Sequence, residues 1–384
     1  MNASVLLAQA ERAMAARDFA RAQDLLRQAA ATSPEDPSIP LRLAGVSRAL
    51  GQPRAALDAV HKALALAPLD FTALLMRANL LDSMGDPAAG EAWGHAIAQK
   101  PAGQVPPHLA TILARGERQH AAWLEAREAR LREAMARAEG SADEEERARI
   151  ARFRSNALRR TRPYHSEPTH FHFPGLVERE FHPPSLFPWL ADLAAGTDAI
   201  AQELQVVMAA ERAELMPYVQ YEEHLPLQQW RPLNNNPDWT AIHLLRHGRR
   251  VEANAVHCPQ TLVLLQALPQ PQISGASPNA MFSLLAPHTV IPPHVGINNA
   301  RLVCHLPLIV PEGCWFRVGA ETRPWVRGAP FVFDDTIEHE AMNPTDQLRV
   351  VLIFDVWHPG LTPTEREAVA ALIGAEDGAA GGAI

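Results

Sequence analysis

Cysteine is scarce in this sequence, and no apolar run reaches the roughly 18 residues of a membrane span. Cys258, Cys304 and Cys314 have no CxxC spacing, which argues against a disulfide framework and against a structural zinc site. Glu11 and Arg12 interrupt the apolar residues near the N-terminus, so no signal peptide is predicted. These absences predict a cytoplasmic protein without a transmembrane segment.

Positive charge is also in short supply, because 35 Lys and Arg residues face 43 Asp and Glu residues, for a formal net charge of -8. Affinity for nucleic acid depends on clustered Lys and Arg. The short basic run Arg159, Arg160 and Arg162 lies in an expected linker. No nucleic-acid partner is therefore predicted. At 384 residues, the chain is expected to form more than one folded domain.

Small residues, glycine and proline recur every 34 residues in the first hundred positions. The recurring positions are Ala10, Ala44 and Ala78; Ala22, Ala56 and Gly90; Ala29 and Ala63; Gly51 and Gly85; and Pro34 and Pro68. Small side chains let antiparallel helices approach, glycine permits a tight turn, and proline ends a helix. Residues 3–101 thus resemble tetratricopeptide repeats, which have this period and usually bind peptides or proteins. A generic alanine-rich helical bundle is the alternative.

Composition divides the rest of the chain. We predict helical repeats over residues 1–103, a helical capping or linker region over 104–160, a β-rich domain over 161–363, and a frayed tail over 364–384. In the β-rich part, a helix over 187–211 precedes short apolar runs such as TLVLLQAL, LVCHLPLIV and LRVVLIFDVW, separated by turn residues. This pattern predicts strands of a jelly-roll sandwich or barrel.

A buried arginine is predicted inside this barrel. Side chains alternate between the two faces of a strand, so Arg349 shares its face with apolar Val351 and Ile353. A buried guanidinium needs an anion. Asp355 is a poor candidate, since it lies about 20 Å away along the same strand. Another protein carboxylate or a bound acid could supply the anion.

Histidines occur on other apolar segments of the same region. His294 follows Pro292 and Pro293, which hold the backbone extended, and His339 lies in the segment FDDTIEHEA. Gly296 stands where an iron site of two histidines and one carboxylate would place Asp or Glu. Alone, these histidines are weak evidence for a metal.

Four ordered motifs carry a resemblance to a known family. They are HVGINNARLVCHLPL from His294, EGC from Glu312, FDDTIEHE from Phe333, and DVWHPGLTP from Asp355. With them, residues 239–363 resemble the aspartyl/asparaginyl β-hydroxylases, which are Fe(II)- and 2-oxoglutarate-dependent dioxygenases. The resemblance implies a double-stranded β-helix, the cupin-like jelly roll, after the N-terminal helical repeats.

The resemblance also implies roles for single residues. His294 and His339 match the two iron ligands, and Gly296 matches the family's own glycine in place of a carboxylate. Ser283, His305 and Arg349 match the positions that hold 2-oxoglutarate, with Arg349 on its distal carboxylate. Asp334, Asp335 and Glu338 are then candidate partners of His339. Val303 and Leu245 depart from an arginine and a tryptophan of the animal enzyme.

The implied activity is hydroxylation of a C–H bond by O2, with the β-carbon of an Asp or Asn in a protein or peptide as the target and the repeats as the recruiting element. Hydroxylation of a small molecule or a lipid acyl chain is an alternative, since the family includes hydroxylases of protein Asp or Asn side chains and others that act on lipid acyl chains. Two further alternatives are a non-catalytic peptide-binding scaffold and a cupin-like metal enzyme, such as an isomerase, that does not use 2-oxoglutarate.

Overall fold

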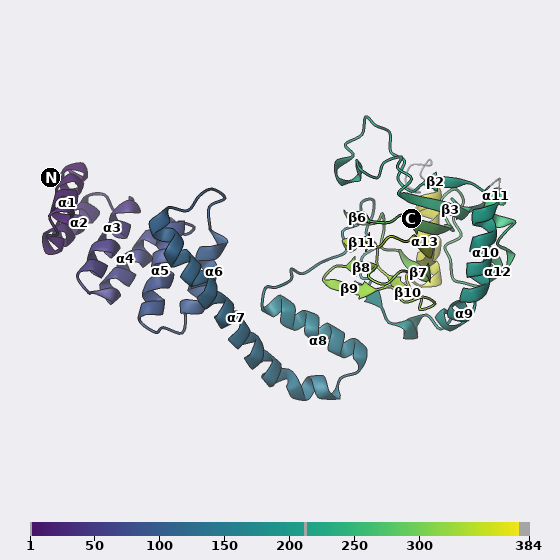
Figure 1. Cartoon of the computed structure of the whole chain (residues 1–384), viewed down its shortest axis with the longest axis horizontal. Coiled ribbons are helices and arrows are strands. Elements are labelled where there is room, and N and C mark those ends of the chain that lie inside the picture. The colour runs from purple at the N-terminus through teal and green to yellow at the C-terminus, as the bar shows by residue number, and fades with distance from the viewer. Residues whose placement is uncertain (1, 211–212, 376–384) are drawn as a thin grey trace. The chain divides into compact units, whose positions relative to one another are not determined.

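The computed structural model describes residues 2–210 and 213–375, which form two compact units, Met1–Ala142 and Asp143–Ile384. The first unit is helical, and the second is built on antiparallel sheets (Figure 1). The expected linker region is divided between them, because its long helix belongs to the first unit and the next helix to the second. No helix within the described ranges combines the length and the apolar character needed to cross a bilayer.

Helical hairpins repeat along the first unit. They are α1 (Ala3–Ala15) with α2 (Phe19–Thr32), α3 (Ser38–Ala49) with α4 (Pro53–Leu66), and α5 (Phe71–Ser83) with α6 (Ala89–Ala98). The recurring small residues lie where the helices meet, since Ala10, Ala44 and Ala78 are all fully buried. The predicted tetratricopeptide-like organisation is therefore present.

The turn inside each hairpin places one residue in the left-handed region of backbone space. Gly51 and Gly85 have φ values of 70° and 66°, and Arg17 takes the same place in the first hairpin with φ 59°. Glycine adopts this conformation without steric cost, whereas an arginine does so at about 1 kcal/mol. The recurring glycines of the sequence are thus explained by turn geometry.

Helix α7 (Pro107–Ser141) closes the last hairpin. Its first half packs against α5 and α6, and Leu113 joins the same apolar core as Trp93. The expected helical region over 104–160 contains two helices, because Asp143 and Glu146 form a capping box that begins α8 (Glu144–Ala157).

Two antiparallel sheets form the second unit. The larger has the strand order β1-β10-β7-β12-β5-β3-β2, with β4 beside β3, and the smaller has the order β6-β11-β8-β9. The strands of the larger sheet are β1 (Phe181–His182), β2 (Leu215–Pro217), β3 (Trp239–Arg246), β4 (Arg249–Arg250), β5 (Ala280–Leu285), β7 (Arg301–Ile309), β10 (Phe331–Phe333) and β12 (Arg349–Trp357). Those of the smaller are β6 (Thr289–His294), β8 (Trp315–Val318), β9 (Glu321–Pro324) and β11 (His339–Asn343).

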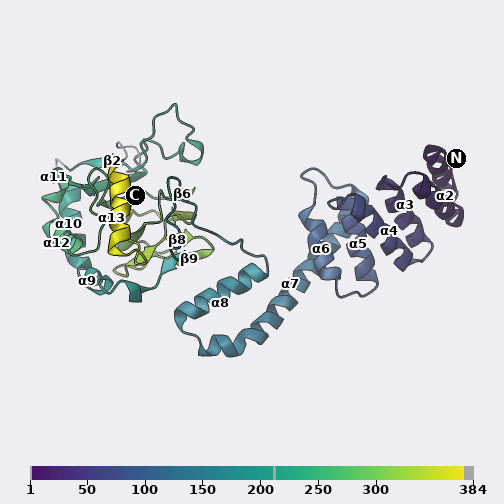
Figure 2. The ribbon, with the colours of Figure 1, turned by 180° about the vertical axis from the view of Figure 1, so that it is seen from behind.

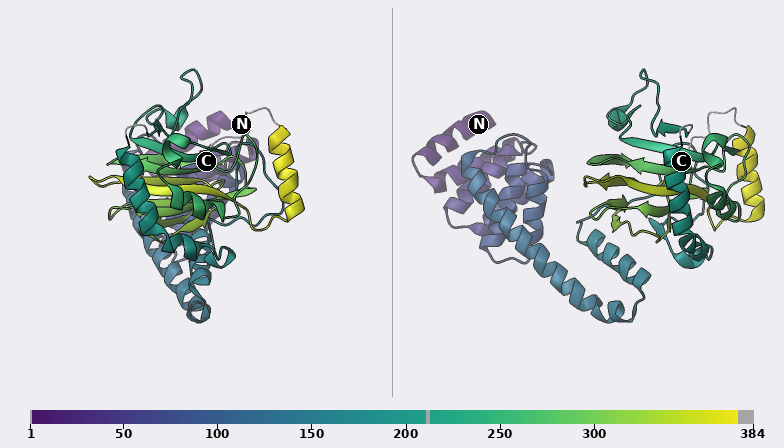
Figure 3. Two further views of the ribbon diagram at one scale, coloured as in Figure 1. Left: turned by 90° about the vertical axis from the view of Figure 1, so that its right-hand side faces the viewer. Right: turned by 45° about the vertical axis from the view of Figure 1, so that its right-hand side comes forward.

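The larger sheet buries both of its faces. Its inner face shares an apolar cluster with the smaller sheet, in which Ala241, Val303 and Val351 meet Phe316 and Ala341. Its outer face is covered by helices, chiefly α9 (Leu190–Ala195), α10 (Thr197–Ala209) and α12 (Pro259–Gln266) (Figure 2 and Figure 3). The expected single helix over 187–211 is two helices that meet at Gly196. The candidate site residues of this sheet lie on its inner face.

The predicted strand TLVLLQAL is wrong, because this segment forms helix α12. Pro259 occupies the first turn, where its missing N–H does no harm. Buried Glu203 of α10 accepts hydrogen bonds from Gln260 N, Thr261 N and Thr261 Oγ1, at 2.6–2.8 Å. The helix begins because a residue 58 positions away caps it.

Alanine at Glu203 should destabilise the chain by about 2–3 kcal/mol, because the buried donors at the start of α12 lose their shared acceptor. Denaturant titration of the whole protein measures this loss. Alanine at Glu367, an exposed acid on the last helix, is the matched control and should stay within about 0.5 kcal/mol of wild type. Equal effects from the two variants would contradict the capping role.

The expected frayed tail is helical over its first part. Helix α13 (Pro363–Ala375) begins with reciprocal hydrogen bonds between Thr362 and Glu365 and buries Val369 and Ile373. The sequence prediction missed the helix because its apolar face is narrow. The rest of the expected tail, residues 376–384, lies outside the described residues.

Candidate active site

A cavity of about 760 Å3 lies between the two sheets. The inward-facing positions of both sheets line it, so strand alternation decides which side chains reach it. The predicted site residues Ser283, His294, His305, His339 and Arg349 all contribute to its wall. The structure thus brings together residues that lie up to 66 positions apart in the chain.

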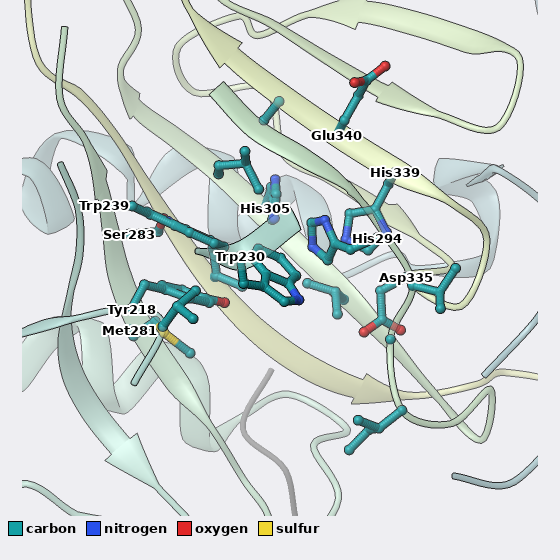
Figure 4. A pocket seen from close by; sticks show the side chains of 18 of the residues that line it. Tyr218, Trp230, Trp239, Met281, Ser283, His294, His305, Asp335, His339 and Glu340 are labelled. Carbon is teal, nitrogen blue, oxygen red and sulfur yellow. The ribbon is translucent and has the colours of Figure 1, made fainter. Parts of the chain in front are cut away.

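The two histidines predicted to bind metal face each other across adjacent strands. His294 ends β6, His339 begins β11, and the two are register partners. Their ring centroids lie 4.0 Å apart (Figure 4). The Nδ1 atom of His294 lies 2.8 Å from Pro292 O, and that of His339 lies 3.1 Å from Ile337 O. A carbonyl can only accept, so each Nδ1 carries the proton and each Nε2 keeps a free lone pair.

The surroundings of these rings favour their neutral form. Burial lowers the pKa of His294 to about 3 and that of His339 to about 4. For His294, the neighbouring His339 lowers the pKa further. Neutral imidazole with a free Nε2 is the form that ligates metals. The histidine pair therefore fits a divalent transition metal.

A carboxylate fills the space beside Gly296. A Cβ atom at this position would lie 2.2 Å from Asp335 Oδ2. Asp335 is held there by Arg301, whose Nη2 donates to Oδ2 at 3.1 Å, and by its own carbonyl, which accepts from Gly296 N. Its Oδ1 has no hydrogen-bond partner among the described residues. Gly296 is thus required by close packing as well as being the residue that the resemblance implies.

The described part of the chain contains no cluster of three or more His, Cys, Asp or Glu side chains placed to hold a metal. The metal site predicted from His294 and His339 accordingly has protein ligands from histidine alone. Other positions around a bound metal would be left for water and co-substrate.

Aspartate at Gly296, which restores the common pattern of two histidines and one carboxylate, should impair the protein. The new side chain would collide with Asp335, at a cost of about 1–3 kcal/mol, and would add a second carboxylate to the same buried space. Thermal unfolding and metal affinity both report this. The paired variant Gly296→Asp/Asp335→Gly removes the collision and should recover most of the stability. A stable single variant that binds metal more tightly would contradict the packing argument.

The acids near His339 have other partners than the sequence predicts. Asp334 accepts from Thr336 N at 2.9 Å and from its hydroxyl, while Glu338 accepts from Arg317 and Arg162. The backbone carbonyl of Ile337, rather than an acidic side chain, accepts the hydrogen bond of the His339 ring. Burial raises the pKa of Asp334 to about 7. The hypothesis that Asp334 and Glu338 orient His339 is not supported by these contacts.

Arg349 forms the second part of the site. It is 1% exposed, and its Nη1 donates to the carbonyl and the hydroxyl oxygen of Ser283 at 3.3 and 3.4 Å. The Trp325 ring lies over the guanidinium, 4.8 Å from its centroid to Cζ. Burial lowers the pKa of Arg349 to about 10, so the side chain stays charged at neutral pH. No carboxylate within the described residues forms an ion pair with it.

His305 and Ser283 complete this anion-binding corner. The Nε of Arg349 and the Nδ1 of His305 are buried and have no hydrogen-bond partner in the ranges that the structure describes. Burial, and then the charge of Arg349, lower the pKa of His305. Unused donors beside a buried cation fit the carboxylate of a bound acid. The corner therefore fits 2-oxoglutarate, as the resemblance implies.

Aromatic side chains that the sequence analysis overlooked connect the two parts of the site. Trp239 Nε1 donates to Ser283 Oγ at 3.0 Å, and the Tyr218 ring stacks on Trp239 at 3.8 Å. Trp230 lies between this stack and His294, with ring centroids 4.9 Å apart (Figure 4). Alternation along β3 would have indicated Trp239, because it shares a face with Ala241. Trp230 ends a 3-10 helix of three residues, Gln228–Trp230, which carries no such signal.

Other histidines of the second unit lie in different surroundings. His170 lines the cavity, whereas exposed His288 pairs with Asp346. His358 is buried against His182, with ring centroids 5.3 Å apart, outside the cavity. These residues have no assigned role in the site.

Known proteins match the part of the chain that contains the candidate site residues. Residues 195–359 match the family model described as Aspartyl/Asparaginyl beta-hydroxylase. The human aspartyl/asparaginyl beta-hydroxylase is 33% identical over 187 residues, which is 48% of this chain and 24% of that protein. The ornithine lipid ester-linked acyl 2-hydroxylase of Rhizobium tropici is 34% identical over 180 residues, or 46% of this chain and 60% of that protein.

Human aspartate beta-hydroxylase domain-containing protein 2 is 37% identical over 147 residues, 37% of this chain and 40% of that protein. The chain therefore aligns with less than two thirds of the length of each of these relatives. Among solved structures, the Sgt2 TPR domain from Aspergillus fumigatus matches 30% of this chain and 78% of its own at 24% identity and a TM-score of 0.28. Residues 195–359 of this chain are therefore similar in sequence to the aspartyl/asparaginyl β-hydroxylase family, and tetratricopeptide-like hairpins precede them.

Proposed function

We propose that this protein is an Fe(II)- and 2-oxoglutarate-dependent dioxygenase that hydroxylates an unactivated C–H bond. One observation carries the proposal: a pair of neutral histidines with free Nε2 atoms shares a cavity with a buried arginine that has no carboxylate partner in the described chain. The first feature suits a metal, and the second suits an organic acid bound beside it. We further propose that the two facing sheets form the double-stranded β-helix of this family.

The reaction would balance as follows. One atom of O2 enters the substrate as a hydroxyl group, and the other enters the carboxylate of succinate as 2-oxoglutarate loses CO2. The bound iron would supply the redox chemistry that activates O2. His294 and His339 would hold the metal, while Arg349, Ser283 and His305 would fix the acid in one orientation. Apolar Ile291, Val303 and Ile353 would exclude water.

The Trp239–Ser283–Arg349 chain of hydrogen bonds would set the position of the co-substrate. Trp239 donates to the Ser283 hydroxyl, and Arg349 contacts the same oxygen. The serine proton is then free to point toward a bound carboxylate. A rigid tryptophan behind the serine limits its rotation, and this preorganisation lowers the entropy lost on binding.

We propose the β-carbon of an Asp or Asn side chain as the target, in a protein or peptide recruited by the N-terminal hairpins of a cytoplasmic enzyme. The names of the human relatives support this choice, and helical repeat arrays commonly bind peptides. The Rhizobium tropici relative keeps lipid acyl hydroxylation as the alternative. A non-catalytic scaffold is disfavoured, because side chains suited to a metal and side chains suited to an organic acid line the same cavity.

A coupled assay tests the proposal. The purified protein is incubated with Fe(II), ascorbate, O2, 2-oxoglutarate and a library of Asp- and Asn-containing peptides, with succinate and peptide mass as the readouts. Succinate together with a peptide gain of one oxygen atom would support the activity and its target. Succinate without a modified peptide would support the dioxygenase and reject the peptide target. Metal binding without any 2-oxoglutarate binding would reject the dioxygenase.

A further inference from the structure

The cavity holds a second cation that the proposed co-substrate does not use. Arg246, at the end of β3, lines the cavity, and its one side-chain hydrogen bond within the described residues is to Met216 Sδ, at 3.5 Å. Its Nε is buried without a hydrogen-bond partner in the described structure, and no described acid forms an ion pair with it. A half-buried guanidinium that lacks an anion indicates a place where one binds.

A buried histidine lies beside it on the same strand. His243 is 8% exposed and lines the cavity, and its Nδ1 has no hydrogen-bond partner among the described residues. Burial and the charge of Arg246 keep its pKa low, at about 4. A neutral imidazole can still donate one hydrogen bond. His243 and Arg246 thus offer a donor and a charge at one end of the cavity.

The acids of the cavity are committed elsewhere. Asp335 pairs with Arg301, and Glu340 with Arg317. Glu338 is bound by the same Arg317. None of them is available to neutralise Arg246. Among the described residues, the cavity therefore has two cations without an acidic partner, and the proposed co-substrate would account for the one at Arg349.

An apolar wall separates His243 from the co-substrate corner. In the larger sheet, His243 pairs with Met281, Met281 with Ile353, and Ile353 with His305. Three strand spacings of about 4.8 Å place the Cα atoms of His243 and His305 about 14 Å apart. Only Met281 and Ile353 stand between them in this row. An anion bound beside His243 would therefore be held away from the co-substrate corner, across apolar side chains.

We infer that His243 and Arg246 form a second anion-binding subsite, which takes an acidic group of the substrate distinct from the residue that is hydroxylated. This inference rests on the proposed function, since it assigns the substrate of that site. For a peptide, the acid would be an Asp or Glu side chain, or the C-terminal carboxylate, with an apolar residue between it and the hydroxylated position. Val303, in the row next to His305, extends the apolar wall.

The test uses the full chain loaded anaerobically with Fe(II) and saturating 2-oxoglutarate, so that Arg349 is occupied. Peptides with one Asp and a Glu placed one to four residues away are titrated and compared with the same peptides carrying Gln. In the wild type, Glu should improve affinity by about tenfold or more at one preferred spacing. The Arg246→Met variant should lose this preference while it binds 2-oxoglutarate normally.

Three further variants sharpen the test. Arg246→Glu should prefer the peptide with Lys in place of Glu, because a reversed charge reverses the selectivity. Arg249→Met removes an exposed arginine from the strand that pairs with the end of β3, and it should keep the wild-type preference. The His243→Leu variant should weaken the preference without reversing it.

The outcomes separate the two proposals. Failure of metal-loaded wild type to bind 2-oxoglutarate would reject the proposed function itself. Normal 2-oxoglutarate binding with no Glu preference at any spacing, or a preference that survives Arg246→Met, would overturn only the second subsite. The last outcome is Arg246-dependent binding of an amphiphile with an acyl chain and a phosphate headgroup, with no peptide binding. It would overturn the peptide as the source of the acid in favour of a lipid.

Discussion

Alanine at either His294 or His339 is expected to abolish succinate formation and to lower Fe(II) affinity by at least about 100-fold. Loss of an outer-shell partner already lowers metal affinity about 10–100-fold, and these residues would be direct ligands. Within the described residues, no third His, Cys, Asp or Glu side chain is grouped with this pair to compensate for the loss. Metal titration of the anaerobic protein measures the affinity, and the succinate assay measures the activity.

The matched control is His288→Asn, which replaces an exposed histidine of the same unit that pairs with Asp346. Asparagine suits the left-handed backbone at this position, where φ is 56°. This variant should bind Fe(II) as the wild type does. If the alanine variants kept wild-type metal affinity, the histidine pair would be a structural contact and the metal site would lie elsewhere.

Methionine at Arg349 is expected to weaken 2-oxoglutarate binding by about 30-fold to several thousandfold, which corresponds to a loss of about 2–5 kcal/mol from a buried charged contact. Lysine should recover only part of it, because its ammonium lacks the planar fork that pairs with a carboxylate. Calorimetric titration with metal present gives the affinities. Fe(II) affinity should remain unchanged, since Arg349 does not contact His294 or His339.

The same variant should fold at least as stably as the wild type. Arg349 is buried, its Nε lacks a partner among the described residues, and methionine is similar in length without the charge. Loss of binding combined with unchanged or higher stability is typical of a functional residue held at some cost to the fold. A strongly destabilised Arg349→Met would indicate a structural ion pair instead. Methionine at exposed Arg327 is the control for the loss of one positive charge.

Strand alternation explains why much of the site could be predicted from the sequence. The face shared by Arg301, Val303 and His305 follows from a period of two residues, and Arg349 follows in the same way from Val351 and Ile353. The structure has these side chains on the inner face of one sheet. The helical hairpins of the first unit could be predicted equally directly from the spacing of small residues, because helices that pack closely need small side chains where they meet.

The errors arose where distant residues decide the local structure. The run TLVLLQAL has no clear period, and its helix depends on the carboxylate of Glu203, which the local sequence cannot reveal. The role of Gly296 depends on Asp335, which lies 39 positions further along the chain and enters the space of a missing side chain. Trp230 ends a short 3-10 helix, and its contact with His294 likewise joins residues far apart in the sequence.

The central claim is that the histidine pair and Arg349 act together, with a metal and an organic acid in one cavity. Isothermal titration of 2-oxoglutarate into the anaerobic protein, with and without Fe(II), tests this claim most directly. Tight 2-oxoglutarate binding is expected only when Fe(II) is present. This binding should be lost in His294→Ala and weakened in Arg349→Met. Equal 2-oxoglutarate affinity with and without metal, or binding that persists in both variants, would contradict it.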